Sequence, residues 1–441
     1  MQTHLWLVAS SLIGVPHLWS LASLLPCIAG SRQGNIDIER KWEYGLPIPT
    51  GQYFRIVMGG VKMRIVVLGG AGDMGSAIVR DLVQSDVSEV IIADFNQEKA
   101  NSICFELKGK KTKLSAQFVD ANDHASLVQA IRGADAVASA IGPFYEFGPK
   151  TAKAAIEAGV SYVDIDDDYD ATKACLELDG EARKEGIAVI IGLGWTPGIT
   201  NVCARYGASK LDRVDEIDIA WAGTAGDTTG YAVLDHAWHA LSGMVPMYLD
   251  GEWRDVPAMS EGKIYDFPQP VGEVQCFYCG HPEPVTIPRF IQGIKAVTLR
   301  GGTYPEIASQ AQVAITMLGL TSTEPIKVGE ASIRPRDFIT AFTHSIADMF
   351  DLGVESSSGT RVEVKGEKGG NPMRYIYRAA DRMYKQTGWP ASIGAQMLAR
   401  GEIKAKGVLP PEACIDPVPF FAQLAKRNIA IYETEETTVR L

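Results

Sequence analysis

The chain has 441 residues, of which 46% are hydrophobic and 22% charged, a balance typical of a globular protein and not of a disordered or fibrous one. Its formal net charge of −11 provides no global positive field for nucleic acid or for an anionic membrane. Seven scattered cysteines argue against a disulfide framework and favour a reducing compartment. We expect a cytoplasmic protein of two or three domains, with no nucleic-acid or membrane partner.

The N-terminal segment differs from the rest of the chain. Residues 1–31 contain no Asp, Glu, Lys or Arg, and the apolar run 5–30 is long enough for a membrane span or a signal sequence. Pro16 interrupts this run, and the first basic residue, Arg32, follows it, whereas a secretory signal needs a basic residue before it. We expect residues 1–62 to be a leader outside the fold; a membrane or export segment and a folded cap are the alternatives.

From Arg64 onward, short β-branched runs alternate with helical stretches, which is the pattern of βαβ units in a parallel sheet. The expected strands are 64–68, 89–93, 114–119, 136–140, 161–164 and 188–191. The expected helices, with apolar residues at i, i+3 and i+4, are 74–84, 97–108, 125–131, 149–158 and 171–185. This order predicts an α/β fold with a Rossmann-type, doubly wound parallel sheet over residues 63–200.

The alternation stops after Thr196-Pro197-Gly198. Residues 201–385 are richer in turns, and the runs 216–221 and 296–300 suggest a mixed or antiparallel sheet in a second, α+β substrate domain. The C-terminal segment, 386–441, contains an expected helix at 388–400 and an acidic stretch, 433–436, expected to be a solvated end.

A glycine motif supplies the main functional prediction. Gly70, Gly72 and Gly75 form G-x-G-x-x-G directly after a predicted buried strand, where the glycines allow a tight turn, close approach of a pyrophosphate and close helix packing. Asp94 ends the second strand about 20 residues beyond, at the spacing of a ribose-binding carboxylate. Because Asp94 would repel a 2′-phosphate and no arginine adjoins it, we expect NAD, with NADP disfavoured. The alternative is a glycine turn that binds nothing.

The loops after the third and fourth predicted strands are further candidates for cofactor contacts. The first would border the adenine and the second the nicotinamide, although ordinary strand-to-loop turns explain both sequences equally well. The predicted cofactor-binding residues are Gly70, Gly72, Asp73, Met74, Gly75, Asp94, Asp120, Ala121, Ile141 and Gly142.

Two competing motifs are weaker. Tyr206 and Lys210 fit the Y-x-x-x-K of short-chain dehydrogenases, but they follow the sixth predicted strand, and i, i+4 neighbours on a helix explain the spacing. Cys276 and Cys279, with histidines some 40 positions before them, are a weak zinc signal. We predict no metal.

Several blocks in order resemble the saccharopine dehydrogenase family, in particular its lysine 6-dehydrogenase-like branch. They are Val67–Gly75, Ala140–Tyr145, Ala158–Asp164, Gly192–Asn201, Gly280–Pro288, Thr387–Ala395 and Gly407–Glu412, so the resemblance covers about residues 63–430. It implies a nicotinamide-dependent oxidoreductase acting on the C–N bond of an amino acid such as lysine or saccharopine, with hydride transfer giving an imine that is hydrolysed. It also implies a homodimer formed through the mixed sheet and a C-terminal segment that returns to the dinucleotide domain.

An amino-acid substrate needs a cation for its carboxylate, carboxylates for its ammonium groups and a base. Arg300 or Arg289 could supply the cation. Asp164 with the run 166–168 could supply the carboxylates, and His236 or His239 could be the base. Asp164 also matches the family's wall beside the nicotinamide. The blander interpretations are a surface arginine, a helix N-cap and structural histidines.

We therefore predict Asp164, His236 and Arg300 as catalytic residues of an NAD(P)-dependent oxidoreductase. Gly301 and Gly302 stand where relatives often have Tyr, which leaves the substrate open. The alternatives are a catalytically silent dinucleotide-binding sensor and an atypical short-chain dehydrogenase acting on a carbonyl or alcohol.

Overall fold

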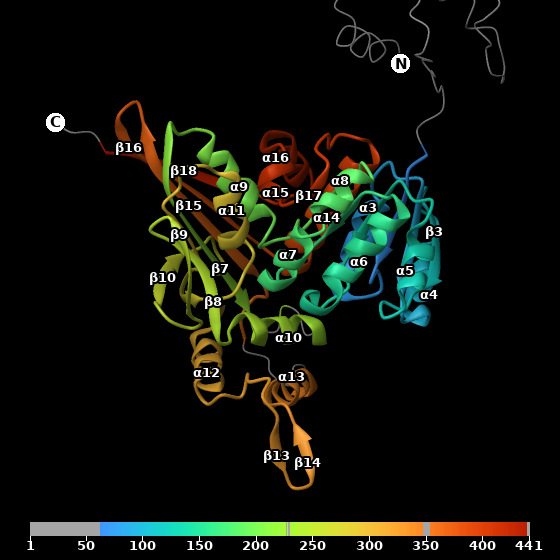
Figure 1. Ribbon diagram of the computed structural model, residues 1–441, viewed down its shortest axis with the longest axis horizontal. Coiled ribbons are helices and arrows are strands. Elements are labelled where there is room, and N and C mark those ends of the chain that lie inside the picture. Colours follow the sequence, from blue (N-terminus) through green and yellow to red (C-terminus); the bar gives the residue numbers. More distant parts are fainter. Residues whose placement is uncertain (1–61, 226, 228–229, 347–352, 439–441) are drawn as a thin grey trace, which may run out of the picture. The chain divides into compact units, whose positions relative to one another are not determined.

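The computed structural model describes residues 62–225, 227, 230–346 and 353–438 (Figure 1). All of them belong to one compact unit that begins at Val61. The predicted leader lies outside the described residues except for its last position. Within the described part of the chain, none of the helices combines the length and apolar character needed to cross a bilayer.

The first sheet is parallel throughout, with the strand order β17-β6-β5-β4-β1-β2-β3. Its strands are β1 (Arg64–Leu68), β2 (Glu89–Asp94), β3 (Lys113–Phe118), β4 (Ala136–Ser139), β5 (Tyr162–Asp164), β6 (Ala188–Ile190) and β17 (Gly407–Leu409). The first six agree with the predicted strands to within one residue at each end, and the Rossmann-type prediction is confirmed. The seventh comes from the C-terminal segment, which pairs β17 with β6.

Helices cover both faces of this sheet. The two apolar clusters that bury its faces take alternate residues of β1, Ile65 and Val67 in one and Val66 and Leu68 in the other. The first cluster packs under α3 (Asp73–Leu82), α4 (Gln97–Glu106) and α14 (Met383–Ala399); the second packs under α5 (His124–Ile131), α6 (Phe144–Ala158) and α8 (Asp179–Lys184). The continuous apolar run of β1 is therefore explained by burial on both sides.

One predicted helix, 171–185, is two helices, α7 (Tyr169–Leu176) and α8. Asp179, the first residue of α8, accepts the backbone N–H of Val408 in β17 at 2.9 Å. The second helix thus begins at a residue bonded to the distant C-terminal strand, a contact that helical periodicity alone does not reveal.

The second sheet is mixed, as predicted, with the order β10-β11-β12-β7-β15-β16-β18 and with β8 and β9 attached at β12. Its strands are β7 (Arg213–Thr224), β8 (Met244–Leu249), β9 (Glu252–Pro257), β10 (Lys263–Asp266), β11 (Glu273–Tyr278), β12 (Ala296–Tyr304), β15 (Ser358–Lys368), β16 (Asn371–Asp381) and β18 (Tyr432–Thr437). β7 and β12 are parallel, whereas the other pairs are antiparallel.

The acidic stretch 433–436 is not a free end, as predicted, but most of β18, an edge strand on β16. Its glutamates pair with basic side chains, Glu433 with Lys210 and Glu436 with Arg374. Because these partners are distant in sequence, a stretch without apolar residues gave no local strand signal.

The remaining helices connect or cover this sheet. They are α9 (Ile199–Ala208), α10 (Tyr231–Ala240), α11 (Glu283–Phe290), α15 (Pro411–Cys414) and α16 (Pro417–Lys426). We call residues 305–346 the arm. It consists of α12 (Glu306–Met317), the hairpin β13 (Ile326–Val328) and β14 (Ala331–Ile333), and α13 (Pro335–Ile346), and it projects at the lower edge of Figure 1 with α13 against α10. The predicted boundaries 63–200, 201–385 and 386–441 stay predictions.

Candidate active site

The turn between β1 and α3 shapes the predicted phosphate site. Gly69 has φ +69°, so the tight turn predicted at Gly70 lies one residue earlier. A Cβ atom on Gly75 would stand 2.0 Å from the Gly69 carbonyl oxygen, so the close contact between helix and turn requires glycine there. Gly72 is the N-cap of α3 and provides no side-chain cap. The first-turn N–H groups, from Asp73 through Met74, can therefore bind an anion.

Asp94 joins the end of β2 to this turn. Its Oδ2 accepts the N–H of Ala71 and its Oδ1 accepts the N–H of Asn96, both at 2.8 Å. A carboxylate oxygen accepts more than one hydrogen bond, so both oxygens can still receive the hydroxyls of a ribose. The uncapped helix end, the glycine contacts and Asp94 together fit a dinucleotide.

The other predicted cofactor residues lie on the same edge, at the carboxyl ends of β3 and β4. Asp120 Oδ1 accepts the N–H of Asn122 at 2.9 Å, and Ala121 is half-buried in the same turn. Ile141 lies beside Gly69, and Gly142 faces Ala232 of α10. A parallel sheet brings the carboxyl ends of its strands to one edge, where ligands of this fold bind.

Helix α10 starts against this edge. A Cβ atom on Gly230, the N-cap of α10, would stand 3.0 Å from Asp73 Oδ2. Two turns along the same helix lie His236 and His239. The predicted bases are therefore carried by an element that begins beside the glycine turn and the β4 loop.

Alternate aspartates form a chain of turns after β5. Asp164 Oδ1 accepts the N–H groups of Gly192 at 2.7 Å and of Asp166 at 3.1 Å, and Asp166 Oδ1 accepts that of Asp168 at 3.0 Å. Burial raises the pKa of Asp164 to about 6 and that of Asp166 well above its usual range. Asp164, predicted as catalytic, therefore lies at the base of a chain of hydrogen bonds that leads to Asp168.

Asp168 and His236 form the central pair of the site. The residues are 68 positions apart, yet His236 Nδ1 lies 2.8 Å from Asp168 Oδ1 and 3.3 Å from a carboxylate oxygen of Asp167. Asp168 occupies the N-cap position of α7, which was the structural alternative for this aspartate run, but its side chain does not cap that helix. Its Oδ2 instead accepts the N–H of Tyr145 at 2.9 Å.

The protonation of this pair follows from its charges. Burial would lower the pKa of His236, but the carboxylates of Asp167 and Asp168 outweigh it and raise this pKa to about 9. Burial would raise the pKa of Asp168, but the charge of His236 outweighs it and lowers that pKa. His236 is therefore a protonated imidazole at neutral pH that is held through Nδ1, and such an imidazolium can act as a proton donor.

A second histidine contacts the first. The rings of His281 and His236 lie 5.5 Å apart, edge to face, and His281 Nδ1 is 3.3 Å from Glu283 Oε2. Glu283 is fully buried and accepts hydrogen bonds from the hydroxyls of Thr196 and Thr200 at 2.7 and 2.8 Å. This network holds His281 beside His236.

Tyr145 and His239 form the third side. Tyr145 donates its hydroxyl to Asp235 Oδ2 at 2.5 Å, and burial with this carboxylate raises the tyrosine pKa well above its usual range. The His239 ring contacts the rings of both Tyr145 and Tyr169, and its Nε2 is 3.2 Å from Asp170 Oδ2. Arg336, from the arm, donates to His239 Nδ1 at 3.1 Å.

Carboxylates outnumber fixed cations in this cluster, which we call the acidic site. Its members are Asp164, Asp166, Asp167, Asp168, Asp170, Asp235 and Glu283, with His236, His239, His281 and Arg336 among them. Two sets, Asp167–Asp168–His236 and Asp168–Asp170–His239, bring possible metal ligands within 4.8 Å of one another. Histidine–carboxylate pairs of this kind also suit proton transfer, and the surplus negative charge suits an ammonium group.

Arg300 does not join this cluster. It lies on β12 beside Gly301, whose Cα is covered by the Trp221 ring, and Trp221 in turn contacts His281. Successive strand residues face opposite sides of a sheet, so Arg300 points to the other face. There it donates to Asp218 Oδ1 at 3.1 Å and stacks on Tyr278. It is neither with the predicted base nor, as the blander interpretation had it, an exposed surface charge.

The competing motifs have local roles. The Lys210 ammonium lies over the Tyr206 ring at 4.0 Å and pairs with Glu433 on the edge strand. Cys276 and Cys279 are free and buried, and the possible metal-ligand groups among the described residues include neither.

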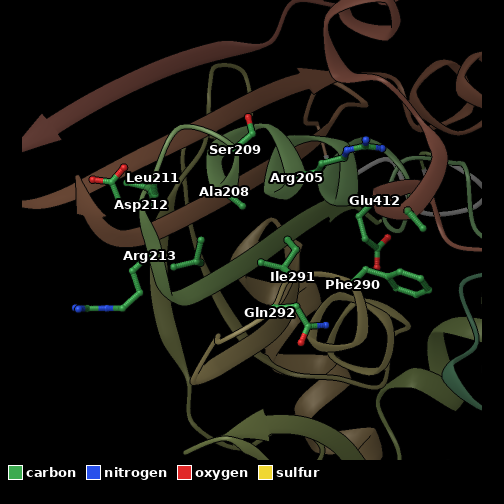
Figure 2. A pocket seen from close by; sticks show the side chains of 12 residues that line it. Arg205, Ala208, Ser209, Leu211, Asp212, Arg213, Phe290, Ile291, Gln292 and Glu412 are labelled. Carbon is green, nitrogen blue, oxygen red and sulfur yellow. The ribbon is translucent and has the colours of Figure 1, made fainter. Parts of the chain in front are cut away.

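A surface pocket of about 530 Å³ lies between α9, β7 and α11 (Figure 2). None of the predicted site residues lines it. Its two arginines are already engaged, Arg205 by the Ile415 carbonyl at 2.7 Å and Arg213 by Asp215 and Glu367. The pocket is therefore separate from the acidic site.

Sequence reasoning missed Tyr145, Asp235, Glu283 and Arg336. Tyr145 and Glu283 fall inside blocks that resemble the family, which was a usable signal. Asp235 adjoins His236, but Arg336 carries no motif and reaches the site through the fold of the arm.

Two family models match this chain. The saccharopine dehydrogenase NADP-binding domain matches residues 65–190, and the saccharopine dehydrogenase C-terminal domain matches residues 194–429. Carboxynorspermidine synthase of Vibrio cholerae is 26% identical over 391 residues, which cover 80% of this chain and 92% of that protein. The Vibrio alginolyticus enzyme of the same name is 26% identical over 397 residues, with the same coverage.

A solved dehydrogenase from Clostridium difficile is 12% identical, covering 83% of this chain and 99% of its own, with a TM-score of 0.37. The two domain matches together span nearly all of the described residues and meet between β6 and α9. The chain belongs to the saccharopine dehydrogenase family of NAD(P)-binding oxidoreductases.

Proposed function

We propose that the protein makes or breaks the C–N bond of a cationic amine, of the lysine, saccharopine or carboxylated polyamine type, by hydride exchange with a nicotinamide. The observation that carries this proposal is the Asp168–His236 pair, set among surplus carboxylates on a helix that begins beside the glycine turn. The similarity to two carboxynorspermidine synthases supports an amine as substrate.

The bound nicotinamide would supply or accept the hydride. The carboxylates of the acidic site would hold the ammonium groups of the substrate and offset their burial. Because His236 is protonated at neutral pH, it acts as a general acid toward a carbinolamine or imine, which favours reductive formation of the C–N bond. In the oxidative direction the same ring accepts a proton only as the pH rises toward 9. Asp168 holds the ring through Nδ1 in both directions.

For the cofactor, we propose a preference for NAD. Asp94 stands at the end of β2 with its carboxylate fixed by two backbone N–H groups, where a 2′-phosphate would meet its charge. The next residues are Phe95 and Asn96, which offer no cation for that phosphate.

For assembly, we propose a homodimer. The arm exposes large apolar side chains, among them Ile307 (67% exposed), Met317 (81%) and Phe338 (53%), which a second copy could cover. Light scattering of the purified protein tests this, and a monomer at micromolar concentration would contradict it.

The activity is tested with purified protein, NADH or NADPH, and mixtures of amines with aldehydes, followed by the loss of reduced-nicotinamide absorbance. We expect turnover with at least one pair, and the reverse reaction with the corresponding secondary amine or amino acid. Cofactor binding without turnover of any amine, carbonyl or alcohol would instead favour the catalytically silent sensor.

A further inference from the structure

Three arginines among the described residues are more than 90% buried: Arg300, Arg336 and Arg361. Arg300 lies 3.1 Å from Asp218, and Arg361 lies 2.7 Å from Glu363, so each has a carboxylate partner. Arg336 has none within 4.0 Å among the described residues. A buried cation without a direct counter-ion is costly, because burial removes its hydration and no carboxylate contacts it in place of water.

The arm and α10 hold the Arg336 side chain in place. Its Nε donates to the Thr321 carbonyl at 3.1 Å, and its Nη1 donates to His239 Nδ1 at 3.1 Å. These bonds use two of the five N–H groups of a guanidinium, and both acceptors are uncharged. The orientation of Arg336 is therefore fixed by neutral partners, as expected of a side chain prepared for an anion that binds later.

The surroundings place this anion site inside the acidic site. His239 contacts the rings of Tyr145 and Tyr169, and the charge of Arg336 acts on both phenols. His236 and His239 are three residues apart on α10, so their side chains are neighbours about 5–6 Å apart. A carboxylate on Arg336 would therefore lie one helical turn from the proposed acid, a short carbon chain away from the reacting nitrogen.

We propose that Arg336 binds the carboxylate of the amine substrate and so selects amino acids and carboxylated polyamines over simple diamines. This inference rests on the proposed function and names the feature of the amine that the site requires. The planar guanidinium matches a carboxylate through two parallel hydrogen bonds, whereas the surplus aspartates repel any anion placed elsewhere in the cluster. The role that the sequence suggested for Arg300 thus passes to an arginine on the arm.

The test compares two pairs of ligands that differ by one carboxylate: L-lysine with cadaverine, and carboxynorspermidine with norspermidine. Calorimetric titration into the protein saturated with NADH gives the affinity for each ligand without requiring turnover. We expect the wild-type protein to favour the carboxylated member by roughly 10- to 100-fold in at least one pair, the ratio for hydrogen bonds to a charged group.

Arg336→Gln should remove this preference and leave the affinity for the simple amine and for NADH unchanged. Arg336→Lys, which keeps the charge and is the milder change to the fold, should retain part of the preference. Arg334→Gln is the matched control, because Arg334 lies two residues away on the arm, exposed and paired with Asp337, and it should behave as wild type. Thermal unfolding of each variant reports on folding.

Three results would overturn the inference. They are a preference that survives in Arg336→Gln, an equal loss of affinity for both members of a pair, and a loss of NADH affinity alone, which would assign Arg336 to the cofactor phosphates. In each case the wild-type protein still turns over an amine, and the proposed function stands. Absence of binding and turnover with every amine in the wild-type protein would overturn both.

Discussion

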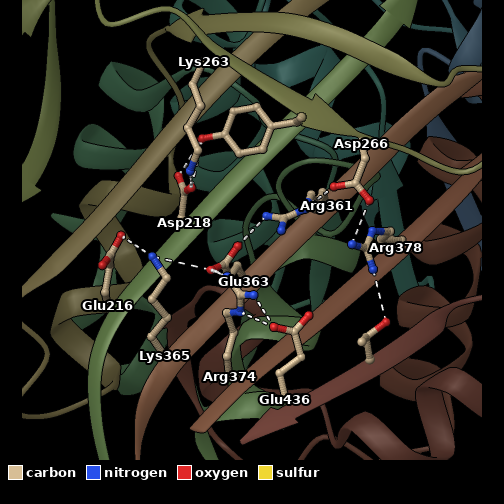
Figure 3. Close-up of polar contacts among 12 residues, drawn as sticks. Glu216, Asp218, Lys263, Asp266, Arg361, Glu363, Lys365, Arg374, Arg378 and Glu436 are labelled. Atoms are coloured by element: carbon tan, nitrogen blue, oxygen red, sulfur yellow. Dashed lines mark hydrogen bonds and ion pairs between the residues drawn. The ribbon is translucent and has the colours of Figure 1, made fainter. Parts of the chain in front are cut away.

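The buried charges on the two sides of the mixed sheet are compensated to different degrees. On one face, Asp218 meets Lys263 at 2.6 Å, and Glu363 meets Arg361, Lys365 and Arg374 (Figure 3). On the same face, Arg300 lies 3.1 Å from Asp218. Burial would raise the pKa of each carboxyl, but the neighbouring cations outweigh it and lower both values. We call this the sheet network.

The acidic site, beyond the other face, is not balanced in this way. Burial dominates at Asp164 and Asp166 and raises both pKa values, and Arg336 lacks a carboxylate partner among the described residues. A balanced network stabilises the fold, whereas an unbalanced one keeps charge available for a ligand. Both clusters contain buried carboxylates and a buried arginine, so the presence of these groups alone does not distinguish a structural cluster from a functional one, whereas their charge balance does.

The largest effect is expected when a substitution breaks the Asp168–His236 pair of the acidic site. His236→Gln should lower kcat by about 10²–10⁴-fold, the usual contribution of a general acid, with NADH affinity unchanged in a fluorescence titration. His124→Gln is the control, because His124 also pairs with a carboxylate, Glu157 at 2.7 Å, but on the surface. A wild-type kcat in His236→Gln would remove His236 from the mechanism.

The next largest effect is a loss of stability when the sheet network is broken. Asp218→Asn leaves Arg300 and Lys263 without their buried counter-charge, so the free energy of unfolding should fall by about 3–5 kcal/mol in urea titration. NADH affinity should not change. Asp215→Asn, on the exposed end of the same strand, should cost less than about 1 kcal/mol. Equal costs for the two variants would contradict the contrast between a buried network and a surface pair.

A smaller effect is expected at the cofactor edge. Asp94→Ser removes the charge that opposes a 2′-phosphate, so the ratio of the NADPH and NADH dissociation constants should shift toward NADPH by roughly 10- to 100-fold. Asn96→Ser, next to the same strand, serves as the control. An unchanged ratio in Asp94→Ser would show that this carboxylate does not select the cofactor.

The smallest effect concerns pH. The folded pKa of His236, about 9, lies above its ordinary 6.5, so the proton is retained and its stabilising effect is complete below about pH 6.5 and lost as the pH rises through about 9. The rate of reduction should fall over the same upper range. Asp167→Asn removes one of the carboxylates that raise this pKa, and the falling limb should move down by about one pH unit. A limb that stays in place would assign it to another group.

The cofactor edge could be predicted because its contacts are local. Gly70, Gly72 and Gly75 lie in one turn between a strand and the helix that follows, and Asp94 ends the adjacent strand. Apolar periodicity located these elements to within a residue or two. The prediction placed the turn glycine at Gly70, whereas the residue with the positive φ is Gly69, because adjacent glycines in a sequence do not indicate which of them adopts that angle.

The acidic site was less predictable because its contacts are distant in sequence. His236 was a candidate among several, and the choice depends on Asp168, 68 residues earlier, which a chain of side-chain-to-backbone bonds from Asp164 positions. Likewise the strands β17 and β18 exist through pairing with β6 and β16, not through their own apolar pattern.

The sequence by itself determined the Rossmann-type sheet, the glycine turn, the acidic end of β2 and the family, because each depends on neighbouring residues whose conformations follow from local chemistry. Only the tertiary structure separates Arg300 from Arg336, an arginine that the sequence did not single out. The pleat of β12 directs Arg300 to the face where Asp218 neutralises it, and the fold of the arm brings Arg336 to His239. Which buried charge remains without a partner is a property of the whole arrangement, since it depends on every neighbour the fold brings near.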